Sequence, residues 1–195
     1  MKKITLFAIG VFGLLTANAQ VGFGVKAGYN LADFKGRTGD NPGMKSGFHA
    51  GGFVRIPVSG KFSIQPELLY SQQGVNDEVQ VNEVTYQQKL KTNYLTLPVL
   101  FQYQSPLGIN VSTGPQLGYL LSSKLEANKG SMDYKDFLKS TDISWVLGAG
   151  YEMRNGLGIG ARYCWGLNNV SDSYNDLRSR VLQVGLSYKF GSGKK

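Results

Sequence analysis

The feature that most constrains this sequence is a two-residue alternation of apolar side chains with polar or small ones. It is clearest in the last run, 178–190. In an extended strand, Val184 and Leu186 share one face while Gln183 and Gly185 share the other. A helix would scatter these residues around its circumference. The run therefore predicts a β-strand with one apolar face.

The same alternation recurs in seven earlier runs, which predicts eight strands in all. The expected strands are 21–34, 46–58, 62–72, 92–104, 109–121, 142–153, 157–165 and 178–190. Short turns, such as the hairpin signal Asn155-Gly156, alternate with long polar connections. The long connections are 35–45, 73–91, 122–141 and 166–177. This order predicts an antiparallel up-and-down sheet with its long loops at one end.

Two local features modify this pattern. Alternation inside 73–91 predicts a hairpin that rises beyond the rest of the sheet. Pro66, Pro98 and Pro115 fall inside expected strands, where a proline cannot donate a ladder hydrogen bond. We therefore expect bulges or breaks at the three prolines.

The second face of the strands distinguishes a membrane barrel from a soluble one. A soluble eight-stranded carrier places its apolar face inside, and a membrane barrel places it outside. The second face here combines charged and amide side chains with many glycines, which suits a narrow, hydrogen-bonded lumen. Aromatic residues also gather near both strand ends, as in the two girdles of a membrane barrel. The predicted fold is all-β, an eight-stranded antiparallel up-and-down transmembrane barrel.

The interior of such a barrel is just wide enough for side chains to fill. Charges buried in this space need partners of opposite sign. We therefore predict a structural charge network in the lumen, formed by Lys26, Arg55, Glu67, Glu152 and Arg162. A proton or small-ion path along these groups is the alternative, and a wide aqueous pore is not expected.

The N-terminus has the pattern of a secretory signal peptide. Two lysines precede an apolar run at 4–15, and Ala17-Asn18-Ala19 supplies a cleavage pattern. The apolar run is too short to span a bilayer as a helix. We expect a cleaved signal peptide at 1–19 and one barrel domain at 20–195, located in the outer membrane.

The charge balance bears on the partners. The chain has 21 basic and 13 acidic residues, and loss of Lys2 and Lys3 with the signal peptide leaves 19 and 13, a net charge of +6. The basic residues are dispersed, which argues against a nucleic-acid groove. An exported basic chain meets outer-membrane lipid and lipopolysaccharide, and these are the partners we expect, with no nucleic acid.

Several motifs resemble the PorT-like outer-membrane β-barrel family. They are Asn93-Tyr94-Leu95-Thr96-Leu97-Pro98-Val99-Leu100, Gly114-Pro115-Gln116-Leu117-Gly118-Tyr119-Leu120-Leu121, Leu147-Gly148-Ala149-Gly150-Tyr151-Glu152, and Ala161-Arg162-Tyr163 followed by Gly166-Leu167. The resemblance covers essentially the whole mature chain and is more specific for fold than for activity. PorT itself is associated with a protein secretion system, so the resemblance implies secretion-system partners. It carries over no functional residue.

The last strand also resembles the C-terminal signature by which outer-membrane barrels are delivered to the barrel-assembly machinery. The signature is a polar residue, a glycine two places on, and two aromatics spaced by one. In this chain these residues are Gln183, Gly185, Tyr188 and Phe190. The resemblance therefore implies the barrel-assembly machinery as a partner.

No residue pattern predicts catalysis. A hydrolase or acyltransferase needs a base beside a nucleophile and an orienting group. His49 is the single histidine, and Ser46, three residues away in a strand, falls on the opposite face. Cys164 is the single cysteine and is expected as an inert, packed thiol. We expect no enzymatic activity, no cofactor and no metal.

The leading functional hypothesis is a monomeric integral outer-membrane barrel with a structural or recognition role. Its lumen is filled by side chains, and its outer loops, above all 73–91 and 122–141, carry the contacts. One alternative is an accessory component of an outer-membrane protein secretion system. A second alternative is a soluble exported carrier of apolar ligands, which requires the opposite orientation of the two faces.

Overall fold

The computed structural model describes residues 21–35, 43–81, 84–127, 130–133, 135, 138–169 and 178–191. The predicted signal peptide lies outside these residues, as do parts of the predicted loops. The described residues form nine strands. They are β1 (Gly22–Lys35), β2 (Gly43–Ser59), β3 (Phe62–Val81), β4 (Val84–Gln104), β5 (Ile109–Ala127), β6 (Gly130–Asp133), β7 (Thr141–Glu152), β8 (Leu157–Gly166) and β9 (Arg178–Lys189). Within the same residues there is no helix of the length and apolarity needed to cross a membrane.

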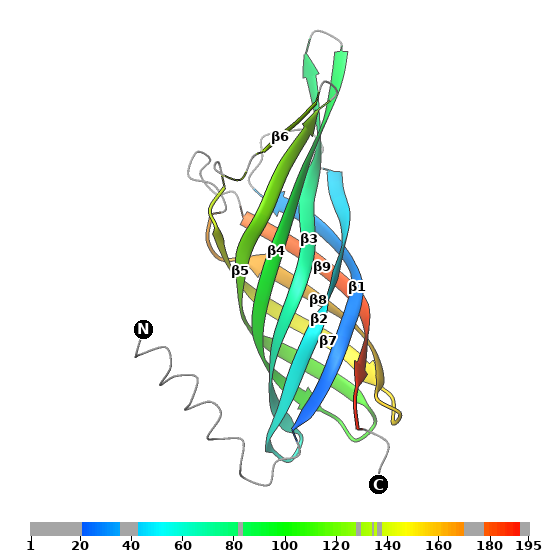
Figure 1. Cartoon of the computed structure of the whole chain (residues 1–195). Helices are drawn as coiled ribbons and strands as arrows, with labels where there is room; N and C mark the ends of the chain where they lie inside the picture. The colour runs from blue at the N-terminus through cyan, green and yellow to red at the C-terminus, as the bar shows by residue number, and fades with distance from the viewer. Residues whose placement is uncertain are drawn as a thin grey trace, which may run out of the picture.

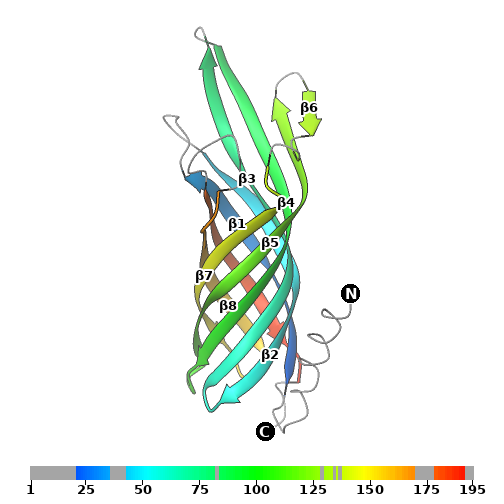
Figure 2. The same cartoon turned by 90° about the vertical axis from the view of Figure 1, so that its left-hand side faces the viewer.

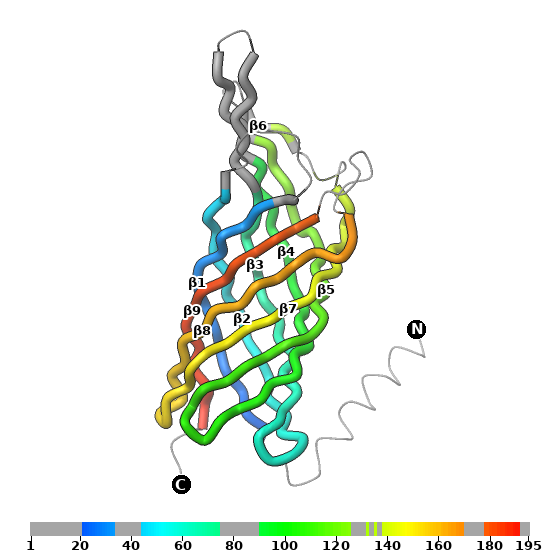
Figure 3. The backbone as a smooth tube through the Cα atoms, turned by 180° about the vertical axis from the view of Figure 1, so that it is seen from behind, coloured from blue at the N-terminus to red at the C-terminus, as the bar shows by residue number. Residues whose placement is uncertain are grey.

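Eight of these strands close into an antiparallel barrel. The sheet order is β4-β3-β2-β1-β9-β8-β7-β5-β6, and pairing of β4 with β5 joins the two ends (Figure 1). Strand β6 pairs only with β5 and forms a short hairpin outside the barrel wall (Figure 2). Viewed from behind, the last strand lies between the first strand and β8 (Figure 3). The predicted fold class is confirmed.

The apolar face of the strands points outwards. Mid-strand Leu117, Leu147 and Val184 are 48%, 51% and 48% exposed, whereas Arg162 on the opposite face is 7% exposed. Exposed apolar side chains follow the same alternation around all eight strands of the barrel. The alternative of a soluble carrier with an apolar interior is therefore wrong.

Short turns join the strands at one end of the barrel. At the turn between β7 and β8, Gly156 has a φ of +90°, a region that side chains other than glycine rarely adopt, and donates to the carbonyl of Met153 over 3.0 Å. Aromatic rings contact one another near this end, where the ring centroids of Phe62 and Phe101 are 5.4 Å apart. At the other end, Tyr163 stacks on Trp165 at 6.1 Å. These contacts belong to the two predicted aromatic bands.

Several strands extend beyond their predicted bounds. The segment 73–91 is not a separate loop, because β3 and β4 continue through it and stay paired as far as Val81 and Val84. The predicted rise of this hairpin beyond the barrel is confirmed (Figure 2). In the predicted loop 122–141, β5 continues to Ala127 and β6 returns beside it. Sequence patterning missed these extensions because polar residues pair as readily as apolar ones outside the barrel wall.

The predicted bulges at the three prolines are wrong. Pairing of β3 with β4 keeps one register past Pro66 and Pro98, and pairing of β5 with β7 keeps one register past Pro115. Each proline instead lies beside a short gap in the ladder to the preceding strand, since it has no N–H to donate. The register shifts occur elsewhere, between Met44 and His49, Pro57 and Ser59, and Asn93 and Tyr94.

A charge placed on the apolar wall tests its orientation. Because Val184 lies near the middle of β9, Val184→Arg is expected to cost roughly 2–4 kcal/mol of folding free energy in a bilayer. The matched control is Leu107→Arg in a short turn, where the side chain is 76% exposed and the expected cost is small. Denaturant titration of both variants in lipid vesicles measures the difference. Equal costs would mean that the wall around Val184 does not face hydrocarbon.

Candidate functional site in the barrel lumen

The centre of the lumen is occupied by an ion cluster around Glu67. Its carboxylate, which is fully buried, accepts from Lys26 Nζ at 2.8 Å and from Arg162 Nη1 at 2.6 Å. Gln65 Nε2 donates to the same carboxylate at 2.8 Å. These side chains come from β1, β3 and β8, so the cluster links strands from different parts of the barrel wall.

A second ion cluster lies nearer the short turns. Glu152 accepts from Arg55 Nη1 at 2.7 Å and from Lys189 Nζ at 2.8 Å. Arg55 Nε also donates to Gln65 Oε1 at 2.9 Å, which connects this cluster to the one around Glu67. The structure thus brings together all five residues of the predicted charge network. Sequence reasoning left Lys189 out, although the alternation of the last strand placed it on the same inner face.

Amide side chains extend the network towards the long loops. Arg162 Nε donates to Gln183 Oε1, and Gln183 Nε2 donates to Asn30 Oδ1 at 2.9 Å. His49 Nδ1 also donates to Asn30 Oδ1 at 2.7 Å, and Asn30 Nδ2 donates to Ser71 Oγ at 3.0 Å. His49 is therefore held by an amide, while Ser46, on the other face of β2, is exposed.

An apolar layer crosses the lumen next to this polar row. We call it the apolar plug, and its members are Ala32, Leu100, Val146, Cys164 and Val181. In the strand register Ala32 faces Val181, Val181 faces Cys164, and Cys164 faces Val146. The predicted position of Cys164 as a buried, packed thiol agrees with its place in this layer. The plug fills the lumen with hydrocarbon at this level.

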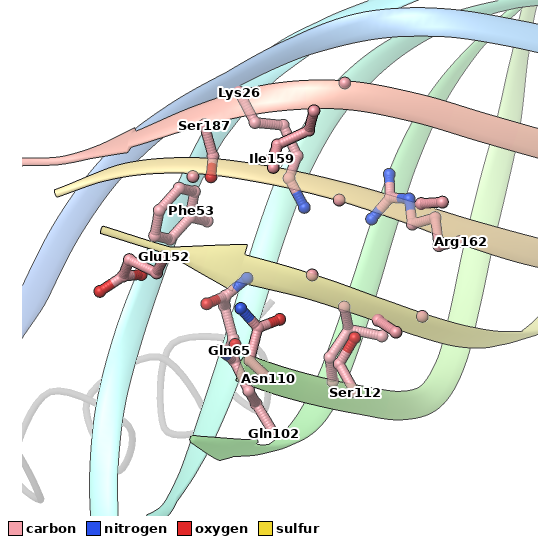
Figure 4. Close-up of a pocket in the computed structure, with 18 of the residues that line it drawn as sticks. Lys26, Phe53, Gln65, Gln102, Asn110, Ser112, Glu152, Ile159, Arg162 and Ser187 are labelled. Carbon is pink, nitrogen blue, oxygen red and sulfur yellow. The ribbon is translucent and has the colours of Figure 1, made fainter. Parts of the chain in front are cut away.

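The other side of the polar row is bordered by glycines. Gly28, Gly185, Gly160 and Gly150 face one another across four adjacent strands, β1, β9, β8 and β7. Without side chains on this wall, a cavity of about 80 Å³ remains below Arg162 (Figure 4). The sequence indicated a glycine-rich inner face, but the alignment of these glycines in one row depends on the strand register.

The residues of the predicted assembly signature divide between the two faces of β9. Gln183 points into the lumen and is bonded to Arg162 and Asn30, and Gly185 belongs to the glycine row. Tyr188 and Phe190 are exposed on the outer wall, with ring centroids 5.4 Å apart. Their recognition by assembly machinery stays a prediction.

Comparison with known proteins identifies the class. Residues 16–172 match the family described as "Outer membrane protein beta-barrel domain". The chain belongs to this family. It is an integral protein of the outer membrane, and its apolar wall faces the membrane lipid. Among the described residues, no group of three or more His, Cys, Asp or Glu side chains is placed to hold a metal ion.

Solved structures share the fold at low sequence identity. Neisserial surface protein A is 14% identical, with 86% of this chain and 97% of that chain covered and a TM-score of 0.58. The Yersinia pestis outer membrane protein Ail, in a phospholipid bilayer nanodisc, is 13% identical over 88% and 100% of the two chains, with a TM-score of 0.49. OprG from Pseudomonas aeruginosa is 13% identical over 87% and 95%, with a TM-score of 0.48. No curated protein matches the sequence at a significant level.

Removing the central carboxylate tests the ion cluster. Glu67→Gln leaves Lys26 and Arg162 as buried cations without their counter-charge, so we expect a loss of about 3–5 kcal/mol in unfolding free energy. Glu152→Gln is the matched control and is expected to cost less, because that cluster is partly solvated at the barrel mouth. Urea unfolding in lipid vesicles measures both losses. Equal costs would show that Glu67 is not the centre of the network.

Proposed function

We propose that this protein is a recognition barrel of the cell surface, whose filled lumen supports contacts made by its outer hairpins. The observation that carries this proposal is the β3–β4 hairpin, whose strands stay paired as far as Val81 and Val84, beyond the barrel wall. Long connections of outer-membrane barrels face the cell exterior. A rigid barrel that continues into an ordered hairpin presents its tip to partners outside the cell.

The filled lumen supports recognition rather than passage of solutes. The apolar plug joins side chains from five strands at one level. Nearer the long loops, Tyr94, Leu120 and Leu138 form a second apolar cluster. On this basis the protein is neither a pore nor an enzyme, and it works as a monomer after delivery by the barrel-assembly machinery.

Lipopolysaccharide is the lipid partner that the outer rim suits best. Lys91 and Lys124 face each other on β4 and β5, and both are exposed. Lys124 lies five residues beyond the exposed Tyr119 of the outer aromatic band. Cations at this height are placed to meet the phosphate groups of the lipid headgroups.

Neutralising these two cations tests the lipid contact. Lys91→Gln combined with Lys124→Gln is expected to remove about 1 kcal/mol of stabilisation per cation in bilayers that contain lipopolysaccharide, and little in zwitterionic bilayers. Lys61→Gln is the matched control, because Lys61 is exposed in a short turn at the opposite end. Unfolding free energies in the two bilayers measure the effect. An unchanged preference for lipopolysaccharide in the double variant would contradict the contact.

A second candidate function is that of an accessory to protein secretion. It is supported by the PorT-like motifs, among them Asn93-Tyr94-Leu95-Thr96-Leu97-Pro98-Val99-Leu100 and Gly114-Pro115-Gln116-Leu117-Gly118-Tyr119-Leu120-Leu121. In the barrel these motifs lie on β4 and β5, the two strands whose pairing closes the wall. Secretion-system components would then be the partners of the outer hairpins.

Shortening the hairpin distinguishes these functions. Replacing 77–88 by Asn-Gly joins paired positions Asn76 and Lys89 through a two-residue turn and leaves the barrel intact. In a strain that lacks the protein, we expect the wild type to restore both surface binding and any secretion defect, and the shortened variant to restore neither. The matched control replaces 126–131 by Asn-Gly between Leu125 and Met132.

The outcomes separate cleanly. Unaltered protein export in the deletion strain would remove the secretion role. Full surface binding by the variant with the shortened β3–β4 hairpin would contradict the recognition role of that hairpin. Heat-modifiable gel mobility of each variant verifies that the barrel has folded.

A further inference from the structure

The lumen between the apolar plug and the short turns carries more positive than negative charge. The cations are Lys26, Arg55, Arg162 and Lys189. Only two carboxylates, Glu67 and Glu152, face them among the described residues of this part of the lumen. Fully ionised, the groups therefore have an excess of two positive charges.

The other inward acid does not balance this excess. Asp142 lies at the start of β7, on the far side of the apolar plug, where it accepts from Ser179 Oγ at 3.1 Å. The plug residue Val146 follows it on the same inner face of β7. Hydrocarbon side chains thus separate Asp142 from the cations. An excess charge in a narrow, poorly hydrated space is unfavourable unless a counter-ion accompanies it.

The cavity beside the glycine row lies among these cations. Lys26, Arg55 and Arg162 all contribute to its lining, and Figure 4 shows the terminal nitrogens of Lys26 and Arg162 on the same side of it. Amide and hydroxyl groups of Asn110 and Ser112 complete the wall. Glu152 borders the cavity towards the short turns and is already engaged by Arg55 and Lys189.

The cations at the cavity have donors to spare. Arg162 is 7% exposed, and its Nη2 is buried with no hydrogen-bond partner within the described part of the chain. Lys26 Nζ has three N–H donors and gives one of them to Glu67. A buried guanidinium nitrogen without an acceptor costs free energy, which an acceptor in the cavity would recover.

We propose that the lumen cavity binds a small monovalent anion of the halide class, held between Lys26 and Arg162. The ion accepts the spare N–H donors and reduces the charge excess from two to one. A volume of about 80 Å³ holds one such ion with a little water and is too small for a lipid headgroup. The site depends on the glycine row, because side chains at Gly150, Gly160 and Gly185 would enter this space.

The experiment compares salts at equal ionic strength. Wild-type protein refolded in lipid vesicles is heated in sodium gluconate and in mixtures with sodium bromide or chloride. Binding of the ion to the folded state alone raises the unfolding midpoint, with an expected saturable rise of roughly 2–4 °C. An equal midpoint in all salts would overturn the proposal.

Two lysine variants locate the ion. Lys26→Met removes a cation that lines the cavity and is expected to abolish the halide-dependent rise. Lys189→Met removes an equal charge at the barrel mouth, outside the cavity lining, and is expected to retain the rise. Equal loss in both variants would mean that halide acts through the general charge of the lumen, and would contradict a defined site.

A structural measurement is independent of the variants. Crystals of the wild type grown in bromide are expected to show an anomalous scattering peak in the cavity, within contact of Lys26 Nζ and Arg162. Bromide peaks confined to the outer surface would show adventitious ions only and would overturn the proposal.

Discussion

The pairing of β4 with β5 is the contact on which the rest of the structure depends. In hydrocarbon an unpaired strand edge would leave a row of N–H and C=O groups without partners, so a sheet in the membrane must close. With no edges left, each side chain of the wall meets either lipid or the lumen. Closure at eight strands also makes the lumen narrow. Every charge inside it is therefore buried and needs a counter-charge.

The narrow lumen explains how its two walls differ. Large side chains on one strand lie opposite glycines on its neighbour. A Cβ at Gly24 would lie 2.2 Å from Cζ of Phe53, and a Cβ at Gly28 would lie 2.8 Å from Cε1 of His49. Because one wall is bare, long side chains such as those of Lys26 and Arg162 can reach across the lumen and meet at Glu67. The same bare wall leaves the cavity in which we place the anion.

The sequence predicted the barrel well because alternation is a local property. Which face each residue occupies follows from its parity within a strand, so Glu67 and Arg162 could be assigned to the lumen. Their direct contact could not be predicted, since they lie 95 positions apart and the pairing depends on the register of strands that are not neighbours in sequence. Lys189 was missed for the same reason. The prolines misled because a ladder can lose hydrogen bonds without changing register.

The apolar plug also bears on how the protein works. Its side chains come from β1, β4, β7, β8 and β9, and each is attached to a strand held on both sides by backbone hydrogen bonds. Opening the lumen at this level would require these side chains to leave a packed layer or their strands to leave the barrel, and the second would expose backbone groups to hydrocarbon. The outer hairpins carry no such restriction, because they extend beyond the wall where water satisfies the backbone. Interaction with other molecules is therefore least costly at the hairpins, while the charged lumen and its counter-ion serve to hold the barrel together.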